Sequence, residues 1–498
     1  MSFKTRLLST QAISRASLEQ SSVEECSTEN YSAKIPDLIL FNQYNAERYP
    51  YLLLSSASRQ NNTQYDILIA CPQYVLSLNA DKTLDCTNKA LPLYDSFFQT
   101  LEHFYQKGKN EVTHKTEVLN EDELPFTGGW FVYLSYEMAQ EIEPCLTLPD
   151  LPDGQPLAVA ARCPAAIIVD KKNNQCIAVA ETQYAYLLDE LEQDYRDIIS
   201  RNNNESMVDP GQDKIALSRL IEADEQPYLS QFETIRQYII DGDIFQANLS
   251  RLWQATLKNK VEDSDLFRAL SRQNPSSFAA MACLKNMTII SSSPERLVSV
   301  KNDIVETRPI AGTRPRHSDQ QSDNALAEEL LAHPKEQAEH IMLIDLERND
   351  LGRVCRPGSI EVNELMVLES WQHVHHIVSN VRGKLEQNKS PVDVLRAVFP
   401  GGTITGCPKV RCMEILAEME QQARGAYTGS LGYINNDGSM DFNILIRTMV
   451  RDRSGHNTEH NKITFRAGGG IVSDSVAEKE LEETRAKAKG LLKIFSYE

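Results

Sequence analysis

Short β-prone runs separated by polar turns dominate the first part of the chain. Apolar residues crowd the segments YDILIACPQYVLSL (65–78), GGWFVYLSYE (128–137) and AAIIVD (165–170), and the turn-rich LPDLPDGQP (148–156) separates the last two. Such short runs, bounded by Gly, Pro and Asp, predict strands. We therefore expect a strand-rich N-terminal region over residues 36–199, preceded by a loose extension over residues 1–35.

The pattern changes after the polar stretch SRNNNESMVDPGQDK (200–214), which has the composition of a linker. We place this linker at residues 200–224. Beyond it, longer amphipathic helices alternate with strands, in the segments 228–243, 245–257 and 287–300, and no internal repeat is visible. This order predicts an α+β fold, with large, mostly antiparallel β-sheets packed as a sandwich and helices on the outer faces.

Composition narrows the class of partner. The 498 residues carry a formal net charge of -19 without a basic tract, which argues against nucleic acid as a partner, and no apolar run is long enough to span a membrane. Ten cysteines are scattered singly without a CxxC pair, as is typical of reduced thiols in a cytoplasmic protein. The N-terminus lacks the continuous apolar segment of a secretory signal. An anionic substrate would need local cations or a metal ion.

Two segments with helical spacing carry paired glutamates. The carboxylates within each pair are three residues apart, so each pair shares one helix face. Two such faces could converge on a hard cation such as Mg²⁺, although spacing alone favours a solvated charged face. The faces comprise Glu336, Glu339, Leu343 and Glu347 in PKEQAEHIMLIDLERNDLG (334–352), and Glu480, Glu483 and Lys487 in SVAEKELEETRAKAKGLL (475–492).

Two glycine-rich segments could present backbone N–H groups to an anion. FRAGGGIVSDS (465–475) is predicted as a strand, a glycine turn and a helix start, with a purely structural turn as the alternative. FPGGTITGCPKVRCMEIL (399–416) places Pro408 where a helix begins. Lys409 and Arg411 then fall in the first turn of that helix, where cations are unfavourable, so we expect an acidic partner or an anionic ligand.

Three further segments carry single candidates. Glu295 follows a proline in SSSPERL, a fixed position for a general acid. His375 and His376 are adjacent in a strand-like run, so only one can face a given side. Arg447 lies within an apolar strand and should pair with an acid or hold a carboxylate. The structural alternatives are a turn for Glu295, a core histidine for His375 and His376, and a buried ion pair for Arg447.

The order of these motifs is more specific than any one of them. The series QANLSR, SSSPERL, TRPIAGTRPR, AEHIMLIDLERNDLGRV, VHHIVS, FPGGTITGCPKVRCMEI, GSLGYI, IRTM, AGGGIVSDS and ELEETRAKA resembles the chorismate-utilising enzymes. This family includes component I of anthranilate synthase and of aminodeoxychorismate synthase, isochorismate synthase and salicylate synthase. The resemblance spans about residues 225–490 and implies a chorismate-binding catalytic region over 225–492. YLLLSSA and LPFTGGW resemble the N-terminal part of the two aminating enzymes.

The resemblance implies a role for each matching residue. It implies a general acid that protonates the departing C4 hydroxyl, a Mg²⁺ site, groups that hold the two substrate carboxylates, and residues near the ring. Glu295 matches the general acid, and Glu336, Glu339, Glu480 and Glu483 match the Mg²⁺ ligands. The groups that hold the substrate carboxylates are matched by Tyr427, Arg447, Gly468, Gly470 and Lys487. Thr313 and His376 match residues near the ring.

Gln246 favours amination over addition of water. The water-adding relatives have a lysine base at this position, which glutamine cannot replace, whereas ammonia needs no base. No amidotransferase nucleophile motif is evident, so the resemblance implies ammonia from a glutamine amidotransferase subunit (component II). A water-adding synthase and a non-catalytic homologue are the less favoured alternatives, because Gln246 opposes the first and the complete site opposes the second.

Ala311, in TRPIAGTRPR, indicates a different member of the family from the one that the other motifs indicate. Many aminodeoxychorismate synthases have a lysine there that attacks ring C2, whereas anthranilate synthases have alanine. Asn248, the PGGTITG loop, the His375–His376 pair and AGGG all favour an aminodeoxychorismate synthase, as does LLLSSA in place of an LLES-type segment. We therefore predict component I of aminodeoxychorismate synthase, which makes 4-amino-4-deoxychorismate for p-aminobenzoate and folate, with anthranilate synthase component I as the alternative. A nucleophile other than lysine, such as water, must then attack C2.

Overall fold

Two large antiparallel sheets share strands from both ends of the chain. The computed structural model describes residues 3–8, 36–55, 65–110, 124–204, 214–317, 319–370, 374–454 and 461–497. Its first sheet has 13 strands, antiparallel except where β10 pairs with β24. In spatial order these are β1 (Phe3–Leu7), β9 (Gln175–Glu181), β8 (Ala165–Asp170), β3 (Tyr65–Ala70), β2 (Tyr51–Leu54), β12 (Phe278–Cys283), β13 (Met287–Ser293), β22 (Thr448–Asp452), β23 (Lys462–Ile471), β11 (Gln246–Leu257), β10 (Ile215–Glu222) and β24 (Phe495–Tyr497), with β19 (Gly406–Cys407) paired to β11.

The second sheet has 11 strands and mixes the two ends in the same way, since β6 pairs with β20. In order they are β16 (Ile310–Pro315), β18 (Val374–Lys384), β15 (Ile304–Thr307), β14 (Arg296–Lys301), β21 (Met440–Asn443), β20 (Ser430–Asn435), β6 (Gly129–Leu134), β7 (Ala158–Cys163), β4 (Tyr74–Leu78) and β5 (Leu84–Cys86), with β17 (Glu361–Ser370) paired to β18.

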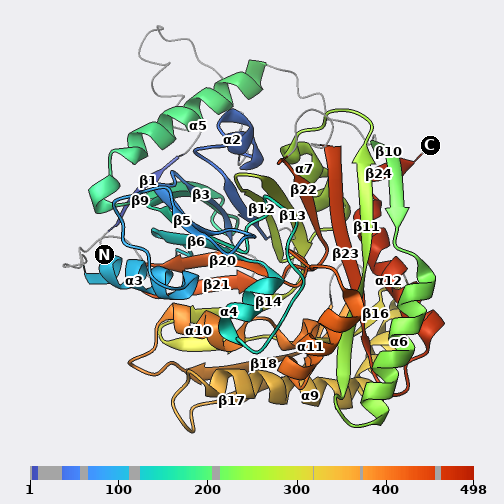
Figure 1. Ribbon diagram of the computed structural model, residues 1–498. Helices are drawn as coiled ribbons and strands as arrows, with labels where there is room; N and C mark the ends of the chain where they lie inside the picture. The colour runs from blue at the N-terminus through green and yellow to red at the C-terminus, as the bar shows by residue number, and fades with distance from the viewer. Residues whose placement is uncertain are drawn as a thin grey trace, which may run out of the picture.

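Helices lie outside the sheets, as Figure 1 shows for α2 and α5 beside the first sheet and α9 beside the second. The helices are α2 (Ile39–Tyr44), α3 (Phe97–Asn110), α4 (Ala139–Ile142), α5 (Leu187–Asn204), α6 (Glu225–Ile240), α7 (Asp263–Gln273), α8 (Gln320–Ala332), α9 (Pro334–Gly352), α10 (Pro391–Val398), α11 (Lys409–Glu420) and α12 (Ala477–Leu492), with short 3-10 turns η2 (Tyr136–Met138), η3 (Thr182–Tyr184) and η4 (Gly402–Ile404). No described helix combines the length and apolarity that a membrane span requires.

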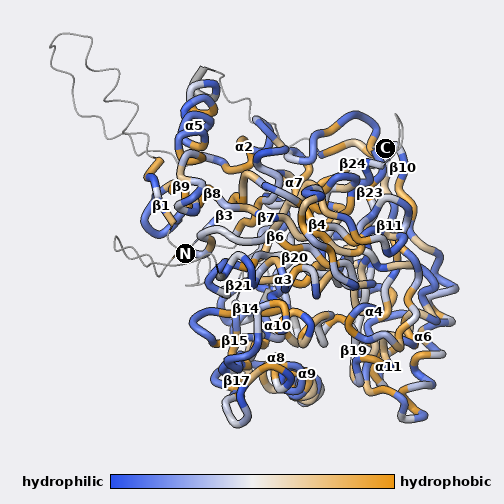
Figure 2. The backbone as a smooth tube through the Cα atoms, turned by 60° about the vertical axis from the view of Figure 1, so that its left-hand side comes forward, coloured by the Kyte–Doolittle hydropathy of each residue, from blue (hydrophilic) through white to orange (hydrophobic). Residues whose placement is uncertain are grey.

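A continuous apolar layer holds the two sheets together. Buried side chains of β2, β3, β12 and β13 meet those of β6, β7 and β20, and the rings of Tyr51 and Phe131 stack with centroids 3.8 Å apart. Two further cores lie under the helices: α2, α5, α7 and α12 cover the first sheet, and α3, α9 and α10 cover the second. In Figure 2, hydrophobic and hydrophilic positions intersperse along α5 and α6, as one-sided packing requires. The predicted sandwich with outer helices is confirmed.

Several predicted segments differ in detail from the observed elements. Phe3–Leu7 forms β1 on β9, and residues 9–35 of the expected N-terminal extension lie outside the described residues. In the stretch 200–224, α5 extends to Asn204 and β10 begins at Ile215, so helix and strand occupy both of its ends. The helix predicted to begin at Pro408 begins at Lys409, with Pro408 as its N-cap residue.

Candidate active site

Glu295 lies in the tight connection between β13 and β14, which fixes its backbone. Its N–H donates to the Ser293 hydroxyl at 3.2 Å, and its carbonyl accepts from the Ile444 N–H at 3.0 Å. The carboxyl is buried and accepts one hydrogen bond, from the Thr403 hydroxyl at 2.7 Å. Burial raises the pKa of Glu295 to about 7. A carboxyl that titrates near neutral pH suits a general acid.

Two cations face Glu295, and their charges oppose the effect of burial on its pKa: Lys487 and Arg447. Arg447, in the connection from β21 to β22, is partly buried with a left-handed backbone (φ 50°). Burial lowers the pKa of Arg447, and no ion pair to it is found among the described residues. A desolvated guanidinium without a carboxylate partner is suited to binding a carboxylate of a ligand. The predicted ion pair within the protein is therefore not found in the described part of the chain, and the alternative of a carboxylate clamp remains.

The three glycines of AGGG lie within β23, so the predicted glycine turn is wrong. Gly468, Gly469 and Gly470 pair with Ser250, Leu249 and Asn248 of β11. Because glycine lacks a Cβ, polar side chains can lie against this strand. A methyl group on Gly468 would stand 2.6 Å from Oδ1 of Asn248 and 2.8 Å from the Tyr427 hydroxyl.

The neighbouring glycines are crowded in the same way. A methyl group on Gly469 would stand 3.0 Å from the carboxylate of Glu480, and one on Gly470 would clash with the amide of Gln246. Lys487, half-exposed on α12, donates to the Gly468 carbonyl at 2.9 Å and pairs with Glu483 at 2.8 Å. The glycine strand thus brings together side chains from β11, α12 and the Tyr427 loop, all of which the sequence had singled out.

Gln246 and Asn248 present buried oxygens without a partner. They lie two residues apart on β11, and neither Oε1 of Gln246 nor Oδ1 of Asn248 has a hydrogen-bond partner among the described residues. A buried acceptor left unpaired is costly, so both atoms are suited to a ligand that donates N–H or O–H groups.

The edge of the second sheet brings Ala311 to Thr313 next to His376. Ala311 is buried and pairs with Ile377, and Thr313 pairs with His376 across a bulge. Gly312 has φ +67° and a methyl group on it would stand 2.9 Å from the Glu336 carboxylate, so only glycine fits here. The His376 ring nitrogen Nδ1 lies 3.3 Å from the Gly312 carbonyl, and burial lowers the pKa of His376 to about 4. Its imidazole is therefore neutral at pH 7.

The adjacent histidine has a structural role. His375 lies 3.0 Å from Asp323 of α8 and 2.7 Å from the Ser370 hydroxyl, both through ring nitrogens. The two histidines therefore have separate partners, as their adjacency in a strand predicts. His376 contacts the segment that contains Ala311 through its ring, at the Gly312 carbonyl.

The four predicted metal ligands lie on two helices. Glu336 and Glu339 are on α9, where Glu336 also lies 3.3 Å from the Arg314 guanidinium. Glu480 and Glu483 are on α12, and both carboxylates approach Gly469, at 3.0 and 4.0 Å from a methyl group placed there. Among the described residues, no three acidic, histidine or cysteine side chains meet as a complete metal site. The oxygen donors fit the preference of Mg²⁺, and the Mg²⁺ site stays a prediction.

Two contacts involve the glycine-rich segment 399–416, one that the sequence did not predict and one that it did. Thr403, in PGGTITG, binds the general-acid candidate, yet nothing in TIT distinguishes its hydroxyl from that of Thr405. Lys409 has the acidic partner that its place in the helix predicted, since its ammonium lies 2.5 Å from Asp350. That pair lies on the α9 side of the glycine-rich loop.

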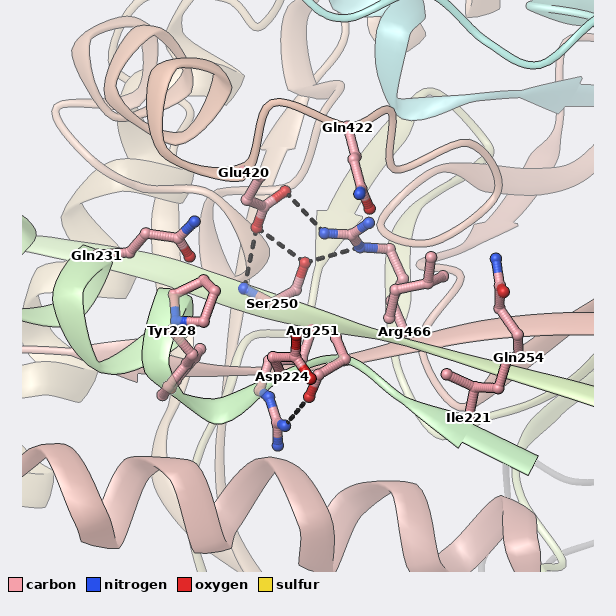
Figure 3. Close-up of a pocket in the computed structure, with 13 residues that line it drawn as sticks. Ile221, Asp224, Tyr228, Gln231, Ser250, Arg251, Gln254, Glu420, Gln422 and Arg466 are labelled. Atoms are coloured by element: carbon pink, nitrogen blue, oxygen red, sulfur yellow. Dashed lines mark hydrogen bonds and ion pairs between the residues drawn. The ribbon is translucent and has the colours of Figure 1, made fainter.

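Two cavities lie outside this group of residues. One, of about 380 Å³, opens beside β10 and β11 and contains Glu420, which Ser250 and Arg466 contact from the facing strands (Figure 3). The other, of about 140 Å³, is lined by Leu53, Leu54 and Ser55 of LLLSSA. Neither is lined by a predicted site residue.

Comparison with known proteins identifies the family. The profile of the chorismate binding enzyme family matches residues 16–493. Over 375 residues, 74% of this chain and 73% of the relative, the chain is 40% identical to the anthranilate synthase component I-like protein of Synechocystis sp.. Over 421 residues, 82% and 83% respectively, it is 39% identical to aminodeoxychorismate synthase component 1 of Bacillus subtilis.

A solved structure agrees with these relatives. Anthranilate synthase component I from Streptococcus pneumoniae superposes with a TM-score of 0.72 at 31% identity, covering 87% of this chain and 93% of that one. The resemblance inferred from the motifs is therefore confirmed: the chain belongs to the chorismate binding enzymes.

Proposed function

We propose that the chain is component I of an aminodeoxychorismate synthase. In this role it would bind chorismate and exchange the C4 hydroxyl for an amino group, with ammonia supplied by a glutamine amidotransferase subunit. The observation that carries the proposal is the buried Glu295 carboxyl, whose pKa burial raises to about 7, and which faces Arg447, a cation with no ion pair among the described residues. An acid and such a cation at one site suit a dicarboxylate that must lose a hydroxyl group.

The cations of the pocket explain how an acidic protein could hold a dicarboxylate. Arg447 would bind one carboxylate, and the Tyr427 hydroxyl and Lys487 would bind the other beside Gly468. Lys487 now pairs with Glu483, so a substrate carboxylate would compete for an existing partner. These local positive charges offset the net charge of -19 at the place where the substrate would bind.

The exchange is balanced in protons. Glu295 would donate its proton to the departing C4 hydroxyl, which leaves as water, as a nucleophile such as water bonds to C2. Ammonia would then bond to C4 as the C2 group leaves, and the new ammonium group would lose a proton. Oε1 of Gln246 and Oδ1 of Asn248, which have no hydrogen-bond partner in the described part of the chain, would accept the N–H groups of ammonia. Gln246 has no basic atom with which to deprotonate water, which supports amination.

Glu336, Glu339, Glu480 and Glu483 would hold Mg²⁺, in agreement with their oxygen donors. When bound, the ion would neutralise a substrate carboxylate and help to orient it.

The preference for the para product rests on where the family-specific residues lie. Asn248 contacts the glycine strand, Thr403 of PGGTITG binds Glu295, and His376 contacts Gly312. All three belong to segments that resemble the aminodeoxychorismate enzymes, and all three touch the candidate site. Pocket-lining residues affect regiochemistry more directly than residues elsewhere.

Anthranilate synthase component I is the second candidate, and Ala311 favours it. Its methyl group is buried beside Thr313 and provides no nucleophile for C2. Direct attack of ammonia at C2 would give the ortho product. Relatives bearing both names match the chain at similar identity.

The product of the purified chain distinguishes the candidates. We would incubate it with chorismate, Mg²⁺ and an ammonium salt, with and without aminodeoxychorismate lyase. Formation of p-aminobenzoate only when the lyase is present would support our proposal. Fluorescent anthranilate that forms without the lyase would favour the second candidate, and isochorismate or salicylate formed without ammonia would contradict amination.

A further inference from the structure

Arg424 is a buried cation next to the candidate site, and the proposed chemistry does not use it. It lies in the connection from α11 to β20, four residues after Glu420 and three before Tyr427, and is 4% exposed. A guanidinium group carries five N–H donors in a fixed plane, and burial makes a partner necessary for each of them. The acceptors of these five donors show which segments Arg424 connects.

The five donors divide between one counter-ion and three segments of the site. Nε and Nη2 donate to the two carboxylate oxygens of Glu420, at 2.9 and 2.8 Å. Nη2 also donates to the backbone carbonyl of Asn248 at 2.5 Å. Nη1 donates to the carbonyl of Ile404 at 3.2 Å and to the Thr428 hydroxyl at 3.4 Å. Every N–H group of the guanidinium therefore has an acceptor within the protein.

Two of these acceptors adjoin residues of the candidate site. The bond to the Asn248 carbonyl holds the strand residue whose Oδ1 would stand 2.6 Å from a methyl group on Gly468. Ile404 directly follows Thr403, whose hydroxyl donates to Glu295 at 2.7 Å. The guanidinium therefore ties β11 to the η4 loop that holds the general-acid candidate.

The third acceptor leads to Tyr427. The Thr428 hydroxyl accepts from Arg424 and donates to the Tyr427 carbonyl at 2.5 Å. The centroid of the Tyr427 ring lies 5.8 Å from the guanidinium carbon, within the range of a cation–π contact. The Tyr427 hydroxyl would stand 2.8 Å from a methyl group on Gly468. Tyr427 and Asn248 therefore approach the same glycine and are held by the same guanidinium.

The backbone of Arg424 is fixed by the N-terminal part of the chain. The buried carboxyl of Glu137, in η2, accepts from the N–H groups of Arg424 at 2.7 Å and of Gly425 at 3.1 Å. The Gly425 carbonyl accepts from the Tyr136 N–H at 2.9 Å, and the Tyr136 ring centroid lies 4.7 Å from the guanidinium carbon. A side chain locked in this way is suited to hold other residues in a defined geometry.

We propose that Arg424 is a positioning residue for the aminating reaction. It holds β11, the η4 loop and the Tyr427 loop at fixed spacing, so that the groups that bind the substrate face the acid. It does not itself bind the substrate, because all five of its N–H groups are engaged. Lysine cannot replace it, since an ammonium group has three donors and no planar fork. The inference rests on the proposed function and holds for either aminated product.

The test compares R424K with R162K, a matched control. Arg162 of β7 is also buried, pairs with the buried Glu181 at 2.6 Å and donates to the Gly129 carbonyl at 3.1 Å, away from the candidate site residues. Calorimetric titration with chorismate and Mg²⁺, without ammonia, measures the Kd apart from turnover. We expect the Kd to rise about tenfold in R424K, as for the loss of one charge-assisted hydrogen bond, and to keep its wild-type value in R162K.

Stability alone does not distinguish the two variants, because both disturb a buried ion pair and both should unfold at lower temperature. A wild-type Kd in folded R424K would overturn the proposal, whatever the change in Tm. The kcat profile adds a second readout. Displacement of Ile404 should weaken the bond from Thr403 that lowers the pKa of Glu295, so the basic limb should move to higher pH in R424K only.

T428V decides the matter where R424K does not fold. Valine keeps the shape of the side chain and removes the hydroxyl that links Arg424 to the Tyr427 carbonyl, whereas T428S keeps that hydroxyl. We expect the Kd for chorismate to rise about threefold in T428V and to be restored in T428S. An unchanged Kd in T428V would overturn the proposal. Wild-type protein that does not bind chorismate would refute the proposed function itself, and this role of Arg424 with it.

Discussion

Glu295 and Glu420 are both buried glutamates, yet their surroundings shift their pKa values in opposite directions. Glu420 accepts a hydrogen bond from the Ser250 hydroxyl at 2.8 Å, and Arg466 lies 3.4 Å from it (Figure 3). It also accepts hydrogen bonds from Arg424 at 2.8 and 2.9 Å. These cations lower the pKa of Glu420 despite its burial. Glu295 has a single hydroxyl partner, and burial raises its pKa to about 7.

The contrast separates a structural carboxylate from a candidate acid. Around Glu420, two guanidinium groups and two hydrogen bonds from Ser250 compensate the charge, so ionisation stabilises the fold. Around Glu295, the charged form is poorly compensated and Arg447 keeps no ion pair in the described residues. Incomplete compensation costs stability and makes a group available for chemistry.

The largest effect is expected from E295Q. This variant keeps the shape of the side chain but cannot donate an acidic proton, so turnover with chorismate and ammonium should fall by roughly 10²–10⁴-fold. Steady-state rates measure the loss, with E361Q at an exposed ion pair as control. Unchanged turnover in E295Q would refute its role as the acid.

E295Q should also change the pH dependence of folding. The folded-state pKa of Glu295, about 7, lies above its ordinary value of 4.5, so the folded chain binds more protons and its stability falls as pH rises between these values. Glutamine abolishes that loss. Thermal unfolding should show E295Q gaining stability relative to the wild type from pH 5 to pH 8, and a constant difference would contradict the raised pKa.

E420Q should have the opposite result. Without the carboxylate, Arg424 and Arg466 remain buried without compensation, and unfolding should cost about 3–5 kcal/mol less free energy. Denaturant unfolding tests this, with E414Q as a control on the same helix at a partly exposed ion pair, where we expect about 0–1 kcal/mol. Equal stability of E420Q and E414Q would show that the Glu420 carboxylate does not stabilise the fold, and that Glu420 and Glu295 do not differ as described.

T403V should have the smallest effect. It removes the hydrogen bond that Thr403 donates to the Glu295 carboxyl, worth about 1 kcal/mol net. That bond lowers the pKa of Glu295, so its loss should shift the basic limb of the activity profile to higher pH. T403S keeps the hydroxyl and should retain the wild-type profile. A shift of the T403V limb to lower pH would mean that Thr403 does not stabilise the ionised acid.

Patterns in the sequence predicted the fold and named most residues of the candidate site, but they did not predict the tertiary contacts between those residues. Alternating apolar strands and amphipathic helices were sufficient for the sandwich, and the ordered motifs were sufficient for the family. The AGGG run was misread as an anion-binding turn, because a glycine run has the same appearance in a turn and in a crowded strand. What decided its place was the approach of Asn248, Tyr427 and Glu480, which no local pattern contains.

The hydrogen bond between Thr403 and Glu295 could not be predicted from the sequence for the same reason. The two residues are 108 positions apart and meet only because η4 packs beside the β13–β14 connection.

The most direct test of the central claim is the position at which nitrogen enters the ring. The purified wild-type chain is incubated with chorismate, Mg²⁺ and ¹⁵N-ammonium, and the product is identified before and after addition of aminodeoxychorismate lyase. We predict labelled 4-amino-4-deoxychorismate, converted to labelled p-aminobenzoate only by the lyase. Labelled anthranilate formed without the lyase would contradict the para assignment and show that Ala311 outweighs the other residues of the pocket.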